Sequence, residues 1–147
     1  MTLTDWLRNG WLQPHSTSPD EIANLLAVAD RDLAAAQLPG LVADWRLAIA
    51  YNAALQLANA ALAAAGYRTT HESHHYRAIQ TLTETVGADS KFVATLEKFR
   101  KKRHQASYEI AGAVADHEVE EMQELARRLA KMVRASLASR HPELMQD

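Results

Sequence analysis

Hydrophobic residues recur every three or four positions along most of the 147-residue chain, which is the period of an amphipathic helix. The clearest stripe lies in residues 92–110. Its members are Phe92, Leu96, Phe99, Ala106 and Ile110. Because no stretch of the sequence alternates polar and apolar residues over the length of a strand, the pattern predicts an all-α fold.

Residues that begin and end helices divide the first half of this pattern. Ser18 can cap a helix that runs to about residue 37, with Pro19 in its first turn. The longest helix is predicted for residues 41–65, and Gly66 ends it. That helix is apolar on two sides, so we expect neighbours on two sides.

The second half of the chain shows three further helices. One is predicted for residues 74–86, and Asp89 or Ser90 can cap the basic helix that follows. Asp116 is expected to cap a last helix that runs to about residue 139.

Polar segments join these helices, and residues 67–73 are read as such a connection. The N-terminus carries Trp6 and Trp11, and we expect a short helix or packed arm there because tryptophan is rarely left in water. The predicted fold is an antiparallel bundle of four to five helices. The length suits one domain, residues 1–147, with residues 1–17 as an arm packed on the bundle.

Three aromatic residues are placed inside or at the edge of this bundle. Trp45 falls on an inward side of the helix at 41–65, and Tyr76 falls on the inner line of the helix at 74–86. We expect Tyr51 and Tyr76 at the edge of the core, with their hydroxyl groups hydrogen-bonded.

Composition narrows the class of protein without identifying its ligand. Lys and Arg number 16 against 18 Asp and Glu, a net charge of −2, so any argument for nucleic acid needs a local cluster. The lack of cysteine excludes disulfides and thiol nucleophiles, and it fits a reducing compartment. The N-terminus does not have the pattern of a signal peptide, and no uncharged apolar run has the length of a membrane span. We therefore expect a cytoplasmic protein.

The local cluster of positive charge lies within residues 92–110. Its members are Lys98, Arg100, Lys101, Lys102 and Arg103. Such a run can form a solvated helix face, or it can follow a phosphate backbone.

Arg103 is unusual because it falls on the apolar stripe, between Phe99 and Ala106. A guanidinium there needs an ion-pair partner or a wet cleft. The candidate partners are Asp44, Glu97 and Glu109. The neighbouring helix face carries Arg100, His104, Ser107 and Tyr108.

A second polar cluster consists of His71, Glu72, His74 and His75. Its composition suits a metal, but His71 is expected outside the helix and a firm fourth ligand is missing. We therefore expect no metal and no cofactor. The alternative is a polar helix start that lines a cleft or caps a neighbour.

The residues that follow Arg103 resemble the motif of the HEPN domains, small helical bundles of prokaryotic toxin–antitoxin and defence systems. That motif is an Arg, then a polar residue, then a His a few residues on. The sequence reads Arg103-His104-Gln105-Ala106-Ser107-Tyr108. Tyr108 thus takes the place of the His, a variant found among HEPN members. The resemblance covers roughly residues 20–137.

This resemblance implies a homodimer in which two motifs face one cleft, with RNA or a nucleotide as ligand and an antitoxin or nucleotidyltransferase as partner. Catalytic HEPN domains are metal-independent ribonucleases, in which a base takes the 2′-hydroxyl proton and an arginine stabilises charge on the phosphate. The candidate catalytic residues are then Arg103, His104 and Tyr108. The candidate ligand- or RNA-binding residues are Arg100, Lys101, Lys102 and Ser107.

Two functions follow from the motif as it stands. Tyrosine is a poor base at neutral pH, so Tyr108 favours a HEPN-like domain that binds RNA, a nucleotide or a partner protein through a basic cleft without cleavage. The alternative is a metal-independent endoribonuclease of the toxin–antitoxin or defence type. For that alternative, Arg100 and His104 form an Arg-x-x-x-His pair one residue tighter than the family spacing.

Overall fold

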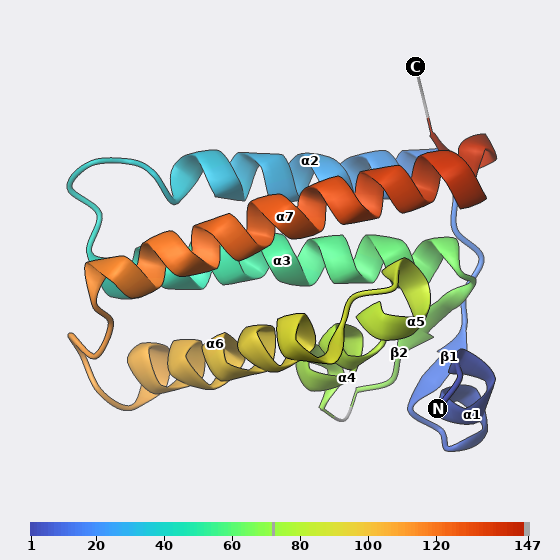
Figure 1. Ribbon diagram of the computed structural model, residues 1–147, viewed down its shortest axis with the longest axis horizontal. Helices are drawn as coiled ribbons and strands as arrows, with labels where there is room; N and C mark the ends of the chain where they lie inside the picture. Colours follow the sequence, from blue (N-terminus) through green and yellow to red (C-terminus); the bar gives the residue numbers. More distant parts are fainter. Residues whose placement is uncertain (72, 146–147) are drawn as a thin grey trace.

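The computed structural model describes residues 1–71 and 73–145, and its fold is all-α with one small sheet. The helices are α1 (Leu3–Arg8), α2 (Pro19–Ala35), α3 (Ala43–Ala64), α4 (His74–Gln80), α5 (Leu82–Val86), α6 (Ser90–Tyr108) and α7 (Asp116–Arg140). The strands are β1 (Leu12–Pro14) and β2 (Tyr67–Thr69), and a short 3-10 turn, η1 (Pro142–Leu144), follows α7. The four long helices α2, α3, α6 and α7 alternate in direction (Figure 1).

Helix α3 is the centre of the bundle. Figure 1 shows α2 and α7 on one side of it and α6 with α4 on the other, in agreement with its contacts. Its buried residues are Leu47, Ala50, Tyr51, Ala53, Ala54, Leu55, Leu57, Ala58, Ala60, Ala61, Leu62 and Ala63. The many alanines let neighbouring backbones approach closely. The expectation that this helix is covered on two sides is confirmed.

By length and composition α3 would also suffice to cross a membrane, and it is the one such helix among the described residues. Inside the fold, 67% of its most apolar window is buried. That burial is what the core helix of a bundle requires, and the apolar character of α3 is accounted for by the helices packed around it.

Two of the predicted helix caps are confirmed by their hydrogen bonds. The hydroxyl of Ser18 accepts a bond of 3.1 Å from the N–H of Glu21, and the carboxylate of Asp89 accepts one of 2.7 Å from the N–H of Phe92. The cap predicted at Asp116 is wrong by one residue. Ala115 is the cap there, and its N–H donates to the Glu118 carboxylate at 3.0 Å.

The small sheet was missed by the sequence pattern. β1 and β2 pair antiparallel, with Leu12 opposite Thr69 and Pro14 opposite Tyr67. Each strand has three residues, which is too short for an alternating pattern to be recognised. The segment 67–73, read as a polar connection, therefore contributes a strand that fixes the N-terminal arm to the bundle.

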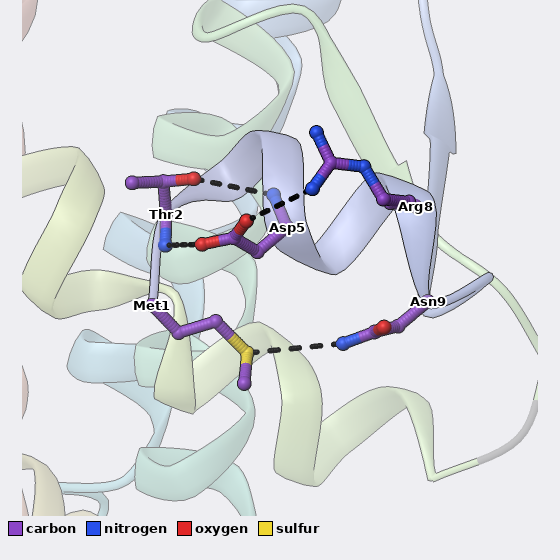
Figure 2. Close-up of polar contacts among 5 residues, drawn as sticks. All are labelled: Met1, Thr2, Asp5, Arg8 and Asn9. Atoms are coloured by element: carbon purple, nitrogen blue, oxygen red, sulfur yellow. Dashed lines mark hydrogen bonds and ion pairs between the residues drawn. The ribbon is translucent and has the colours of Figure 1, made fainter.

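The N-terminal arm begins with α1, whose residues are all partly or fully exposed. Figure 2 shows its capping box: the Thr2 hydroxyl accepts from the N–H of Asp5 at 3.2 Å, and the Asp5 carboxylate accepts from the N–H of Thr2 at 2.9 Å. Trp6 and Trp11 pack edge to face at 5.3 Å, and the guanidinium of Arg77 lies 4.2 Å from the Trp11 ring centroid. The arm is thus joined to the bundle through β1 and Trp11.

Two predicted helix lengths need correction. The helix expected over residues 74–86 is divided at Thr81 into α4 and α5. The Thr81 hydroxyl donates to the carbonyl of Ala78 at 2.7 Å, a local bond that competes with regular helix geometry. The longest helix is α7, with 25 residues, and not α3, with 22.

Two aromatic side chains predicted to face inward are exposed instead. Trp45 is 56% exposed and Tyr76 is 40% exposed. Both lie in the first turn of their helices, α3 and α4. Periodicity identifies the face of a helix, but it does not tell how far the neighbouring helices extend to cover that face.

Candidate functional site

The burial of the side chains of the basic helix α6 changes along its length. Its buried residues, Phe92, Val93, Leu96 and Phe99, all lie in the first half. From Arg100 onward its residues are exposed or only partly buried, and Ile110, the last member of the predicted stripe, is exposed. Arg103 therefore lies where α6 leaves the core.

At that position α4 and α6 enclose a cleft of about 660 Å³. The segment at the start of α4 contributes His71, Ser73, His74, His75 and Tyr76. Helix α6 contributes Glu97, Arg100, Lys101, Arg103 and His104. The expectation that the polar start of the helix after residue 73 lines a cleft is confirmed.

Arg103 occupies this cleft without an ion-pair partner among the described residues. Its guanidinium carbon lies 5.9 Å from the ring centroid of Tyr51 and 5.7 Å from that of Tyr108. Its Nε atom is buried and lacks a hydrogen-bond partner within the described part of the chain. The wet-cleft alternative thus fits Arg103 better than a structural ion pair.

The three acids considered as partners for Arg103 are engaged elsewhere. Glu97 binds Arg100 through two hydrogen bonds of 2.8 and 2.7 Å. Asp44 accepts a bond of 2.8 Å from the N–H of Gly112, and Glu109 lies 3.9 Å from the Nε2 atom of His104.

Tyr51 lies beneath the cleft on α3 and is 1% exposed. Its ring centroid is 6.2 Å from that of His75. Burial raises the pKa of its hydroxyl well above the usual value, so the group stays protonated and able to donate. In the described residues this hydroxyl has no hydrogen-bond partner, so the expectation of a satisfied hydroxyl is wrong.

Arg100 enters the cleft already paired. The hydrogen bonds that Arg100 donates to the Glu97 carboxylate raise the pKa of its guanidinium, whose carbon lies 5.8 Å from the ring centroid of Tyr76. The Glu97 carboxylate neutralises this cation locally, so Arg103 and Lys101 are the cleft cations that have no carboxylate partner among the described residues.

His74 and His75 pack edge to face, with ring centroids 4.3 Å apart. Burial, and after it the charges of His74, Arg103 and Arg100, together lower the pKa of His75 to about 4. His75 is therefore neutral at neutral pH. Among the described residues no group of three or more potential ligands is placed to hold a metal ion, and Glu72 lies outside those residues.

Of the other two residues of the Arg-His-x-x-x-Tyr segment, His104 lines the cleft and Tyr108 lies next to it. The rings of His104 and Tyr108 are 5.0 Å apart, and Tyr108 is 67% exposed. Tyr108 therefore contacts Arg103 through the face of its ring while most of its surface meets solvent.

The residues predicted to bind RNA are divided among three surfaces. Arg100 and Lys101 line the cleft. Lys102 lines an adjoining groove, which Lys101 also lines, and it pairs with Glu118 at 3.7 Å. Ser107 lies in a pocket of about 450 Å³ at the end of the bundle, with Val42, Trp45, Ala111 and Val114 among its other lining residues. Helical spacing puts Ser107 on the same face as Arg100, but Ser107 lies about two turns further along α6, where the start of α3 and the segment after α6 form this other pocket.

Sequence reasoning missed the roles of Tyr51 and Glu97. Tyr51 comes from a different helix, and its spacing within α3 is that of an ordinary core residue. A signal for Glu97 was present, because Glu97 and Arg100 are three residues apart on one helix face. No protein-family model matches the chain, and no curated protein sequence matches it either.

Proposed function

We propose that this protein is a HEPN-like helical domain that binds the phosphate groups of RNA or a nucleotide in the cleft between α4 and α6, and that it does not cleave them. The observation that supports this most is the state of Arg103. Its guanidinium lies in a concave site, its Nε atom lacks a partner among the described residues, and the nearby acids are engaged elsewhere. A guanidinium is suited to bidentate binding of phosphate.

The charge balance of the cleft supports an anionic ligand. Glu97 offsets Arg100, while Arg103 and Lys101 remain without a carboxylate partner in the described residues. The neutral state of His75 removes one positive charge but leaves a polar ring beside the guanidinium groups. The cleft is therefore net positive although the chain as a whole is not.

The absence of cleavage follows from the position of the candidate bases. Tyr108 stands where the HEPN motif has its His, and a tyrosine hydroxyl is a weak base at neutral pH. His104 has the right chemistry, but its side chain is 60% exposed at the rim. A base that must take a proton in the transition state needs a fixed position at the reacting group.

A metal-independent endoribonuclease is the second candidate, and one observation favours it. His75 places a neutral imidazole, a form that accepts protons, in the same cleft as Arg103. Its pKa of about 4 makes it a weak base, however, since a general base works best with a pKa near the working pH. Binding therefore remains the better-supported function.

The proposal includes a two-fold homodimer in the cytoplasm, with an antitoxin or nucleotidyltransferase as a further partner. The support for self-association is an exposed apolar area at one end of the bundle. Val42 and Trp45 are exposed there, and they line one pocket together with Ala111 and Val114. Burial of such side chains on a second copy would provide favourable free energy of association.

The test of ligand binding is an RNA titration with two matched variants. Arg103→Ala should weaken the binding of a short single-stranded RNA roughly tenfold or more, the cost of a charge-assisted hydrogen bond. The control, Arg127→Ala on α7, removes an arginine outside the cleft and should leave affinity unchanged. Equal losses in the two variants, or no binding by the unaltered protein, would contradict the proposal.

A further inference from the structure

The cations of α6 are interspersed with carboxylates in the groove beside the cleft. Lys98, Lys101 and Lys102 line this groove, which also holds three carboxylates, and Lys101 lines the cleft as well. Those carboxylates are Glu97, Glu109 and Glu118. A nucleic-acid backbone that followed the whole basic run would lie against both the lysines and these carboxylates. Repulsion between the phosphates and the carboxylates would offset much of the attraction between the phosphates and the lysines.

In the cleft, by contrast, the donors converge from two helices on one hollow. Arg100 and Arg103 reach it from α6, and His74 and His75 reach it from the start of α4. Beneath it the hydroxyl of Tyr51, a residue 99% buried, and the Nε atom of Arg103 both lack partners in the described part of the chain. Buried polar atoms of native proteins are nearly always satisfied, so two neighbouring exceptions point to a ligand or an ordered water.

We propose that the cleft is specific for a phosphate monoester, as carried by the end of an RNA chain or by a mononucleotide, and not for the internal diesters of RNA. This inference rests on the proposed function. A monoester has about one half to one more negative charge than a diester, and three terminal oxygens that accept hydrogen bonds. It can therefore bind several converging donors at once, whereas an internal diester has two free oxygens and must also pass its chain through the site.

The rim of the cleft supports a nucleoside attached to that phosphate. The ring of Tyr76 is 40% exposed, lines the cleft, and lies beside the Arg100 guanidinium. Exposed aromatic rings next to a cationic groove stack on bases in many proteins that bind single strands. Tyr76 is thus placed to contact a base while the arginines bind its phosphate.

The experiment compares one short single-stranded RNA in three forms by fluorescence anisotropy: with a 5′-phosphate, with a 3′-phosphate, and with neither. At least one phosphorylated form should bind roughly tenfold more tightly than the unphosphorylated form. Equal affinity for all three forms would overturn the inference while leaving the proposed function intact. Failure of all three to bind would overturn both.

A nucleoside monophosphate added as competitor distinguishes the two sources of the monoester. Competition as effective as that of phosphorylated RNA identifies a mononucleotide site, and much weaker competition identifies an RNA end. Both results support the monoester site.

A variant tests whether the buried hydroxyl takes part. Tyr51→Phe keeps the ring and should reduce the preference for the phosphorylated RNA, whereas Arg127→Ala should keep it. If Tyr51→Phe is folded and retains the full preference for phosphorylated RNA, the Tyr51 hydroxyl does not bind the phosphate. If Arg103→Ala also retained it, the inference itself would be overturned.

Discussion

The guanidinium carbon of Arg103 lies 5.9 Å from the ring centroid of Tyr51, and within the described residues each side chain holds a buried polar atom without a hydrogen-bond partner. A buried donor left unpaired lowers stability by about 1–3 kcal/mol. Two such unpaired donors side by side therefore lower the stability of the ligand-free protein. A ligand that accepts their hydrogen bonds would restore that stability. The strongest sign of function in this molecule is thus a pair of residues from different helices, α3 and α6.

Replacement of Tyr51 by Phe should stabilise the ligand-free protein. The substitution removes an unpaired buried hydroxyl and keeps the ring, so we expect the free energy of unfolding to rise by about 1 kcal/mol. Thermal and chemical denaturation followed by circular dichroism would measure the change. The control is Tyr76→Phe, where the ring is partly exposed and little change is expected. A clear loss of stability in Tyr51→Phe would show that the hydroxyl has a partner after all.

Acid should destabilise the protein through His75. Its pKa is about 4 in the folded protein, because of burial and then of His74, Arg103 and Arg100, against an ordinary value of 6.5. Tyr51 packs against the same ring. Between these two pH values, the imidazole is therefore protonated in the unfolded chain and unprotonated in the folded protein. The free energy of unfolding should be highest above pH 6.5 and fall as the pH decreases toward about 4.

The measurement is urea unfolding at a series of pH values, with His75→Gln as the variant. The variant should lose the part of the acid sensitivity that lies in this window. Identical pH profiles for the two proteins would show that His75 does not carry the effect. NMR titration of the imidazole should also show its pKa rising when a phosphate ligand binds, since an anion favours the protonated form.

Much of the helical architecture could be predicted from the sequence because it depends on local signals. Ser18 and Asp89 cap helices as their residue types indicate, and the apolar periodicity of residues 43–64 correctly indicates a helix covered on two sides. The division at Thr81 and the pairing of β1 with β2 were missed. They depend on a single side-chain bond and on a contact between segments far apart in the chain.

The candidate site could be predicted only in part, for a similar reason. Residue spacing along α6 put Arg103 on the inward stripe, where it needed an ion-pair partner or a wet cleft, and its place in the cleft agrees with the second alternative. Spacing could not show that Lys102 and Ser107 face other surfaces. Which surface each residue lines depends on where α7 and the start of α3 pack against α6. The unpaired hydroxyl of Tyr51 is likewise a property of three helices together.

Self-association should depend on Trp45. Light scattering at tens of micromolar protein, a concentration that populates ordinary dimers, should give the mass of a homodimer. Trp45→Glu should shift the protein toward monomer, because it places a charge in the exposed apolar area at the end of the bundle. The control is Arg31→Glu, an exposed site on α2. A monomeric unaltered protein, or a Trp45→Glu dimer, would contradict this prediction.

Salt dependence should distinguish two adjacent lysines. Lys101 lines both the cleft and the neighbouring groove and has no carboxylate partner among the described residues, whereas Lys102 lines the groove and pairs with Glu118. Each cation that contacts a phosphate adds about one to the slope of log affinity against log salt. We therefore expect Lys101→Ala to flatten the slope for RNA and Lys102→Ala to leave it nearly unchanged. Equal effects of the two substitutions would favour a backbone track along the whole basic run.

The remaining prediction concerns cleavage, and it separates the two candidate functions. We expect purified protein to leave RNA intact in the presence of a chelator, because Tyr108 stands where the proposed HEPN-like motif would need a histidine and the side chain of His104 is mostly exposed. Gel analysis of a labelled RNA over hours would measure this. Cleavage that survives the chelator and disappears in folded Arg103→Ala would instead establish the ribonuclease.

In that event the variants would also identify the base. Loss of the arginine that stabilises the charged phosphate should reduce the rate by roughly a hundredfold or more. A comparable loss in His75→Gln but not in His104→Gln would assign proton transfer to the imidazole inside the cleft, and the reverse would assign it to the rim. Tyr108→Phe keeps the ring that contacts Arg103 and should have the smallest effect of the four. A large loss in Tyr108→Phe would show that its hydroxyl, and neither histidine, acts on the substrate.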